Sequence, residues 1–437
     1  MKAKAFILTV LVSAGVILMF VDETNALPTF ARKYRTSCTT CHIGFFKLNP
    51  FGETFRQNGY VIPGGQDAPL VKEEPVSLGA EAWKRAFPDT VWPGAIPANV
   101  PVSFYAHQRI FVDESKDPSV NFKFPHEFKL FTGGTAGEGF SFWSEYNLQS
   151  STLNRIFLRF NDLFSKKNWG SFGIVPEDAL NLRVGRLDVG TLLIPLNTRR
   201  TINKAAPFTY ALGSGAAAWD FSDLQSGIEA NGVVAHRVQY ATGVVNGLSS
   251  SGTPAGVEDN NDAKDYYYRV AYKHGGLSFD GKELAGDQEA ELKQTDNWVD
   301  NALTIGQFGY FGTTTVSTGI ENQFRRIGGD ARINFGNLDL YGALLFGHDG
   351  RPTSTASDVK SWSWFTEADY VIFPWLSAAF GYEKVNYDEA FREDTGAIIG
   401  SLLAWPRANI KLMIEGKVFP EELDGNPQYL IDLTYAF

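Results

Sequence analysis

The chain ends in nine residues whose side chains alternate in character: Tyr429-Leu430-Ile431-Asp432-Leu433-Thr434-Tyr435-Ala436-Phe437. Every odd-numbered position is apolar or aromatic, and the last is a phenylalanine. Successive side chains of a β-strand point to opposite faces, so this pattern predicts a strand with one continuous apolar face. A strand of this kind is typical of the end of a β-barrel in a bacterial outer membrane.

The same alternation begins at Pro101 and continues to the C-terminus. Between residues 407 and 415, for example, the apolar face carries Ala408, Ile410, Leu412 and Ile414, and the other face carries Arg407, Asn409, Lys411, Met413 and Glu415. Counting such segments predicts sixteen strands, with centres near positions 107, 128, 144, 158, 185, 228, 241, 269, 306, 328, 343, 365, 381, 399, 412 and 432. Each runs for about 10 residues, the length that a tilted strand needs to cross a bilayer.

A soluble β-sandwich would produce the same alternation, with its apolar face inside. Aromatic residues near the segment ends favour a membrane barrel instead, because such barrels carry aromatic girdles at both interfaces. These residues are Tyr105, Trp143, Tyr266, Trp362, Trp364, Tyr382 and Trp405. We therefore predict an all-β fold over residues 101–437: a sixteen-stranded antiparallel transmembrane β-barrel, surrounded by outer-membrane lipid.

The loop lengths give this barrel an orientation. An even number of strands places both barrel ends in the periplasm, where turns are short. Short turns are predicted at Val234-Ala235, Gly336-Asn337, Phe373-Pro374 and Trp405-Pro406, and long external loops at 190–222 and 248–263. Residues 276–300 are long where a short turn is expected, so a strand could be miscounted there.

Composition agrees with an exported β-rich protein. Residues 1–26 are predicted to be a signal peptide, with Lys2 and Lys4 before an apolar run and a cleavage site after Ala26. The abundance of glycine and aromatic residues is typical of strands joined by many turns. A net charge of -10 argues against nucleic acid as a partner.

The only two cysteines of the 437 residues lie in Ser37-Cys38-Thr39-Thr40-Cys41-His42. The spacing C-x-x-C-H is the attachment signature of a c-type haem, in which two thioethers hold the porphyrin and the histidine binds the iron. A thioredoxin-like pair would need a βαβ context, a structural zinc site would need four ligands, and a simple disulfide would not need His42. We therefore predict one covalent haem c, held by Cys38, Cys41 and His42.

Residues 27–62 are predicted to be the monohaem cytochrome c module, and residues 63–100 a Pro/Gly-rich linker with one short element near Ala80–Phe87. The module contains a short amphipathic helix around Leu48, Phe51 and Phe55 that ends at Asn58-Gly59. A segment of roughly 35 residues cannot enclose a haem alone. The barrel must supply the missing walls, so we expect the module to plug or cap it.

This N-terminal segment resembles the module of the fused outer-membrane cytochrome–porins of iron-oxidising bacteria. The resemblance rests on Phe30-Ala31-Arg32, Cys38-x-x-Cys41-His42, Leu48-x-Pro50-Phe51-Gly52, Phe55 and Asn58-Gly59-Tyr60. Those proteins combine a signal peptide, a monohaem module and a sixteen-stranded barrel. The resemblance implies electron transfer across the outer membrane, with iron(II) as the extracellular donor.

The sixth ligand of the iron is open at this point, because residues 27–62 contain no second histidine and no methionine. Strand parity directs His107 and Met413 into the lumen, and we predict one of these two as the distal ligand. A different ligand or an open position is the alternative.

Three functions fit these features. The first is an electron conduit from an extracellular donor such as Fe(II) to a periplasmic c-type cytochrome, which could make the chain an iron(II):cytochrome oxidoreductase. The second is a diffusion porin or transport protein whose haem module is a periplasmic plug or sensor. The third is a haem enzyme with an open distal site.

Overall fold

The computed structural model describes residues 29–44, 46–64, 67–77, 82–86, 95–97, 101–190, 202, 206–213, 218–248, 259–286, 288–293, 297–388, 391–420 and 426–437. The predicted signal peptide lies outside these residues.

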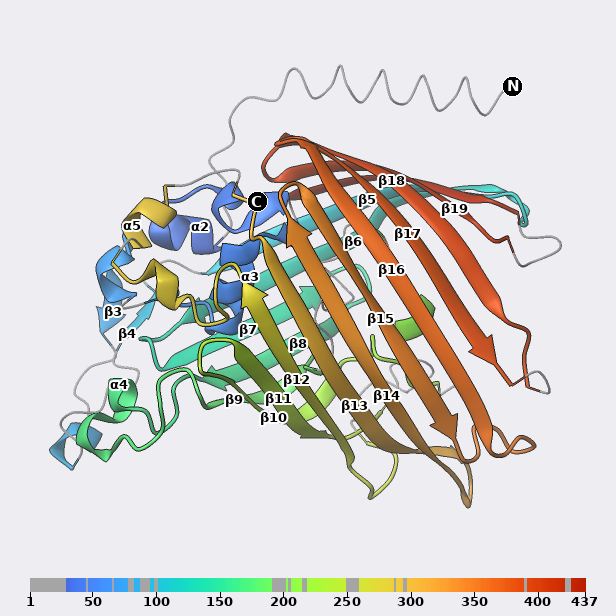
Figure 1. Ribbon diagram of the computed structural model, residues 1–437, viewed down its shortest axis with the longest axis horizontal. Coiled ribbons are helices and arrows are strands. Elements are labelled where there is room, and N and C mark those ends of the chain that lie inside the picture. Colours follow the sequence, from blue (N-terminus) through green and yellow to red (C-terminus); the bar gives the residue numbers. More distant parts are fainter. Residues whose placement is uncertain are drawn as a thin grey trace.

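Sixteen strands form one closed antiparallel barrel (Figure 1). They are β5 Val102–Asp113, β6 Val120–Thr135, β7 Phe140–Asn147, β8 Thr152–Phe160, β9 Asn181–Leu187, β10 Gln225–Val234, β11 Val238–Val245, β12 Asp265–Gly275, β13 Ala302–Ser317, β14 Ile320–Phe335, β15 Leu338–Asp349, β16 Val359–Phe373, β17 Leu376–Tyr387, β18 Thr395–Arg407, β19 Ile410–Val418 and β20 Gln428–Ala436. Each strand pairs with its sequence neighbours, and β20 closes the barrel against β5. The predicted fold is confirmed, and every predicted centre lies within its strand.

The barrel is apolar outside and charged inside. On β12, Val270 faces outward with 47% of its surface exposed, whereas the adjacent Arg269 is 3% exposed and faces the lumen. Lumen charges are paired across strands, as Arg109 on β5 is with Asp432 on β20 at 2.7 Å. A lipid environment requires an apolar outer surface. It also requires a closed barrel, because closure leaves no strand edge with unpaired backbone groups. No helix among the described residues is long and apolar enough to span a membrane.

The N-terminal module, which we define as residues 29–62, lies across one mouth of the barrel, at the end where the C-terminus also lies and which is predicted to face the periplasm (Figure 1). It consists of α2 Thr29–Tyr34, η1 Cys38–Thr40, β1 His42–Gly44, β2 Lys47–Leu48 and α3 Pro50–Gln57. Its contacts reach around the barrel: Thr29 donates to Ser103 on β5, Lys47 pairs with Asp339 on β15 at 2.5 Å, and Gln57 accepts from Arg159 on β8. The module therefore plugs the lumen at this end.

The linker is more ordered than the sequence predicts. It contains η2 Ala68–Leu70, β3 Pro75–Ser77, η3 Ala82–Arg85 and β4 Ala95–Pro97, and β3 pairs with β4. The first part packs on the module, because Asp67 binds both Lys33, at 2.9 Å, and the hydroxyl of Tyr34, at 2.7 Å.

Residues 276–300 contain no strand among their described residues, so the count of sixteen stands. This long periplasmic loop, with η7 Lys282–Leu284 and α5 Gln288–Glu291, packs on the N-terminal module. Leu292 joins the module's apolar cluster with Tyr34, Phe51 and Phe55, and its carbonyl accepts a hydrogen bond from Thr36. The length of the loop allows it to pack against the N-terminal module.

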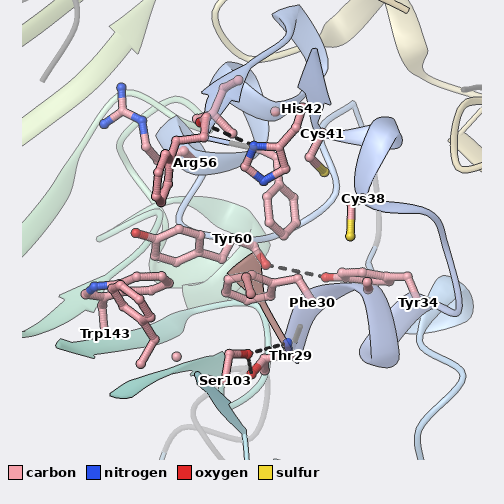
Figure 2. Close-up of a pocket in the computed structure, with 18 of the residues that line it drawn as sticks. Thr29, Phe30, Tyr34, Cys38, Cys41, His42, Arg56, Tyr60, Ser103 and Trp143 are labelled. Atoms are coloured by element: carbon pink, nitrogen blue, oxygen red, sulfur yellow. Dashed lines mark hydrogen bonds between the residues drawn. The ribbon is translucent and has the colours of Figure 1, made fainter. Parts of the chain in front are cut away.

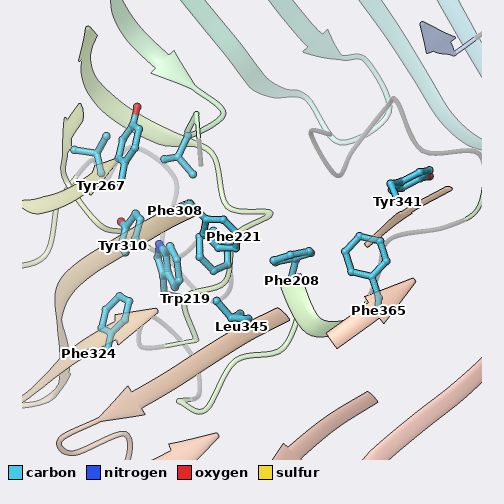
Figure 3. Close-up of a cluster of buried hydrophobic side chains, with 12 residues drawn as sticks. Phe208, Trp219, Phe221, Tyr267, Phe308, Tyr310, Phe324, Tyr341, Leu345 and Phe365 are labelled. Carbon is cyan, nitrogen blue, oxygen red and sulfur yellow. The ribbon is translucent and has the colours of Figure 1, made fainter. Parts of the chain in front are cut away.

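The segment between β9 and β10 is predicted to be a long external loop, and several of its described residues pack into the lumen. Phe208 (in η5 Ala206–Phe208), Trp219 and Phe221 are buried against inward-facing residues of the barrel (Figure 3). We call this the lumen aromatic cluster; it also contains Val189, Val245, Tyr267, Phe308, Tyr310, Phe324, Tyr341, Leu345 and Phe365.

Two details of the prediction are wrong. Tyr105 and Trp405 are buried at 4% and 7% exposure, and Trp143 packs on the N-terminal module, so none of the three belongs to an aromatic girdle. The turn predicted at Trp405-Pro406 falls three residues later, at Ala408-Asn409, because β18 continues to Arg407 through an irregularity at this proline.

Candidate functional site

The two cysteines lie on one turn of a 3₁₀-helix. This turn, η1, begins after Ser37, whose side chain accepts a hydrogen bond from the backbone N–H of Thr39. Cys38 is the first residue of η1 and Cys41 is its C-cap. Both side chains line the same cavity, as two thiols that add to one porphyrin must.

Asn49 fixes the position of this turn. It is fully buried; its backbone N–H donates to the carbonyl of Cys41 at 3.0 Å, and its side-chain amide donates to the carbonyl of Thr40 at 2.9 Å. Its side-chain oxygen caps α3 by accepting from Gly52 at 2.8 Å. A Cβ on Gly52 would lie 2.0 Å from the Cys41 carbonyl oxygen, so only glycine fits there. The sequence interpretation had not assigned Asn49 any role, although its place before Pro50 is a helix-cap signal.

The His42 ring is oriented by a backbone carbonyl. Its Nδ1 lies 3.3 Å from the oxygen of Phe46, across the β1–β2 hairpin. A hydrogen bond from Nδ1–H to this carbonyl leaves the lone pair on Nε2. Metal-binding histidines are held in this way, because the second hydrogen bond fixes the tautomer and the plane of the ring.

A cavity of about 230 Å³ opens beside these three side chains. Figure 2 shows the imidazole of His42 and both sulfur atoms along one side, with the rings of Phe30, Tyr60 and Trp143 opposite. Phe30 stacks on Tyr60 with centroids 5.0 Å apart, and Tyr60 stacks on Trp143 at 5.4 Å. The walls thus come from the module and from the barrel, as the size of the module requires.

Burial controls the chemistry of both thiols. It raises the pKa of Cys41 to about 12 and also raises the pKa of Cys38. Both cysteines are free, without a disulfide. A thiol that stays protonated at neutral pH is a poor redox nucleophile, which argues against a thioredoxin-like exchange function.

Neither predicted distal ligand lines this cavity. His107 faces the lumen as predicted, but its Nε2 lies 3.0 Å from a carboxylate oxygen of Asp432 and its ring packs on His126 at 4.8 Å. Met413 also faces inward, in a separate apolar cluster with Ile202, Ala379, Ile399, Leu403, Trp405 and Leu430. Strand parity gives the face of each residue correctly, but not which side chains meet across the lumen.

The donor set of the cavity fits a c-type haem. Two cysteines, a histidine oriented through Nδ1 and an aromatic wall border one cavity. Its charged lining residues are the arginines Arg56 on α3, Arg155 and Arg159 on β8 and Arg183 on β9, and the carboxylates Glu145 and Asp188, which pair with Arg155. Apolar walls with a few cations suit a flat aromatic cofactor that carries anionic groups.

Comparison with known proteins bears on the barrel. No protein-family model matches the chain, and no curated protein sequence matches it. Among solved structures, the anion-selective porin of Comamonas acidovorans is similar, with a TM-score of 0.53 and 13% identity over 77% of this chain and 98% of that one. OmpF of Salmonella typhi, in complex with daunomycin, is similar with a TM-score of 0.51 and 11% identity, over 77% of this chain and 97% of that one. With its apolar outer surface and its porin fold, the chain is a bacterial outer-membrane β-barrel.

Proposed function

We propose that the protein carries one covalent haem c and conducts electrons across the outer membrane. The donor would be an extracellular reductant such as iron(II), and the acceptor a periplasmic c-type cytochrome. The observation that carries this proposal is the single cavity bordered by Cys38, Cys41 and the oriented imidazole of His42. The haem would supply one-electron redox chemistry; the protein provides attachment, ligation and burial.

The chain's own residues divide these tasks. Cys38 and Cys41 would form the thioethers, and His42 would bind the iron through Nε2. Phe30, Tyr60 and Trp143 exclude water from the opposite wall. Because Trp143 belongs to the barrel, the haem environment would be complete only when the module is docked in the lumen.

Occupation of the lumen supports a conduit over an open pore. The N-terminal module lies at one end, and the lumen aromatic cluster packs against the inner wall of β11 to β16 farther along the lumen. A sixteen-stranded porin barrel would otherwise leave an aqueous channel. Side chains placed inside the lumen would narrow the path for hydrated solutes, which favours electron transfer over diffusion.

The test begins with the cofactor. Purified wild-type protein should retain haem after denaturation, stain for haem on a denaturing gel and give a c-type pyridine haemochrome spectrum. Cys38→Ala/Cys41→Ala should lose covalent haem while its barrel remains heat-modifiable on the gel. Added iron(II) should then reduce the wild-type haem in a stopped-flow experiment. Wild-type protein without covalent haem would refute the proposal, and haem that iron(II) cannot reduce would refute this donor.

A second candidate function is a diffusion porin whose N-terminal module is a plug or sensor. The fold likeness to an anion-selective porin favours it. It predicts solute conductance in planar bilayers with the module in place, and no reduction by iron(II). The conduit predicts low conductance and reduction.

A further inference from the structure

Arg159 is a buried cation without a counter-ion. It lies on the lumen face of β8, lines the cavity and is 6% exposed. One N–H donates to the carbonyl of Gln57, while Nε has no hydrogen-bond partner. Within the part of the chain that the structure describes, Arg159 forms no ion pair. Leaving a buried charge uncompensated costs several kcal/mol in general, so a missing partner is expected.

The neighbouring arginines of the cavity do have partners. Arg155, on the same face of β8, binds Glu145 at 2.5 Å, and its Nε lies 3.5 Å from Asp188. Arg183 lies directly opposite Arg159 on β9 and holds Glu229 through two hydrogen bonds of 2.8 and 2.7 Å. Like charges directly opposite each other repel, so the position of Arg159 is unfavourable without an added anion.

A second unsatisfied donor lies on the module side of the cavity. Arg56, at the end of α3, pairs with Glu53 at 3.1 Å, but its Nε is buried without a hydrogen-bond partner. The residue after it, Gln57, is the one that Arg159 contacts. A guanidinium from the module and one from the barrel thus both line the cavity, and the Nε of each lacks an acceptor.

We infer that Arg159, with Arg56, binds a propionate of the haem. This inference rests on the proposed function and deepens it. Propionates are the anionic groups of a haem, and a planar guanidinium matches a carboxylate with two parallel hydrogen bonds. The contact would join the docked module to β8 through the cofactor, and its positive charge would oppose oxidation of the iron.

The test compares Arg159→Gln and Arg159→Lys with Arg155→Gln as the matched control. The control removes an arginine from the same strand and cavity, and Glu145 keeps Lys129 as a partner at 3.1 Å. Arg159→Gln should shift the propionate bending band in the resonance Raman spectrum and lower the midpoint potential. Arg159→Lys should shift the band but keep most of the potential, because the charge remains. Arg155→Gln should leave the band in place.

The outcomes separate this inference from the proposed function. A haem-loaded Arg159→Gln protein with an unchanged band and potential would overturn the propionate contact and leave the conduit standing. Wild-type protein without haem would overturn both. If the Arg159→Gln protein does not accumulate, the propionate bending band is measured in Arg159→Lys and Arg56→Gln instead. A shifted band supports the propionate contact, and an unchanged band in both variants overturns it.

Discussion

The two ends of the lumen are filled in different ways. The N-terminal module is anchored to the barrel by buried charges and hydrogen bonds, such as those of Lys33 and Lys47, and it leaves a cavity. The lumen aromatic cluster is held by ring packing: Trp219 lies 4.1 Å from Tyr310 and 5.0 Å from Phe324, centroid to centroid. Polar contacts fix the orientation of the module around a space that a ligand can occupy, whereas closely packed rings leave no room between them for a ligand or for water.

The largest effect is expected from Lys47, which joins the module to two strands of the barrel through ion pairs. Its ammonium group lies between the carboxylates of Asp339 and Asp369, and it is 6% exposed. Lys47→Met removes the charge and should weaken docking by about 3–5 kcal/mol, as breaking a buried ion pair does. Limited proteolysis should then cut the module while the barrel stays resistant.

The double variant Lys47→Met/Asp369→Asn should recover part of the wild-type resistance to proteolysis, because it also removes the charge of the carboxylate that loses Lys47. Lys72→Met, at an exposed position, is the control and should behave as wild type. A module that still resists proteolysis in Lys47→Met would mean that apolar packing alone holds it in the barrel.

Trp219 tests the other end of the lumen. It is 3% exposed at the centre of the lumen aromatic cluster. Trp219→Ala should cost about 3 kcal/mol and leave a void that water can enter, because a large buried side chain is lost. We expect higher single-channel conductance in planar bilayers with the haem spectrum unchanged. Trp375→Ala, at a site 52% exposed, should leave the conductance at the wild-type level; equal conductance in both variants would argue that the cluster does not seal the lumen.

Gly52 tests how tightly α3 supports the cysteine turn. A methyl group there would meet backbone, not a movable side chain, at the carbonyl of Cys41. Gly52→Ala should therefore shift the turn at a cost of about 1–3 kcal/mol and reduce the haem content per protein. Gly400→Ala on β18, where an added Cβ meets nothing within 4 Å, serves as control. Full haem loading of Gly52→Ala would show that the turn tolerates displacement.

The smallest effect concerns Asp178, in the loop between β8 and β9. Burial and the neighbouring Asp162 raise its pKa from 3.8 to about 6. The folded state therefore binds the proton of the Asp178 carboxyl more tightly than the unfolded state does. The stability that this difference contributes is complete below pH about 4 and is lost as the pH rises through 6. Asp178→Asn mimics the protonated form and should stabilise the protein by about 1 kcal/mol at pH 7.5, with little effect at pH 4. Melting curves at the two pH values measure the difference, and equal shifts would contradict it.

The strand pattern was the most predictable property of the chain. Alternation places Arg269 inside and Val270 outside without any structure, because the side-chain period of a strand is fixed. The loop at 276–300 is longer than the short turns predicted at this end of the barrel, because it packs on the N-terminal module as well as joining two strands. Trp143 was assigned to a lipid interface because a sequence pattern does not distinguish an aromatic that meets lipid from one that meets a plug.

The candidate site was predictable only in part. Cys38, Cys41 and His42 are near one another in sequence, and a short 3₁₀ turn followed by β1 brings them to one side of a cavity. The opposite wall contains Phe30 and Tyr60 of the module and residues of β5 to β9, which lie far away along the chain. His107 and Met413 have the predicted parity but different neighbours, and Arg159 carries no sequence signal at all.

The sequence by itself determined the barrel, its strand count, the face of each strand that meets lipid, and the cysteine–histidine turn. These properties depend on local periodicity and spacing, which each segment carries alone. Only the tertiary structure decided that Trp143 and Arg159 line the cavity, that Phe208, Trp219 and Phe221 pack inside the lumen, and that the loop at 276–300 packs on the N-terminal module. Those contacts join residues far apart in the chain, and they depend on how the barrel closes and on what its interior must then pack against.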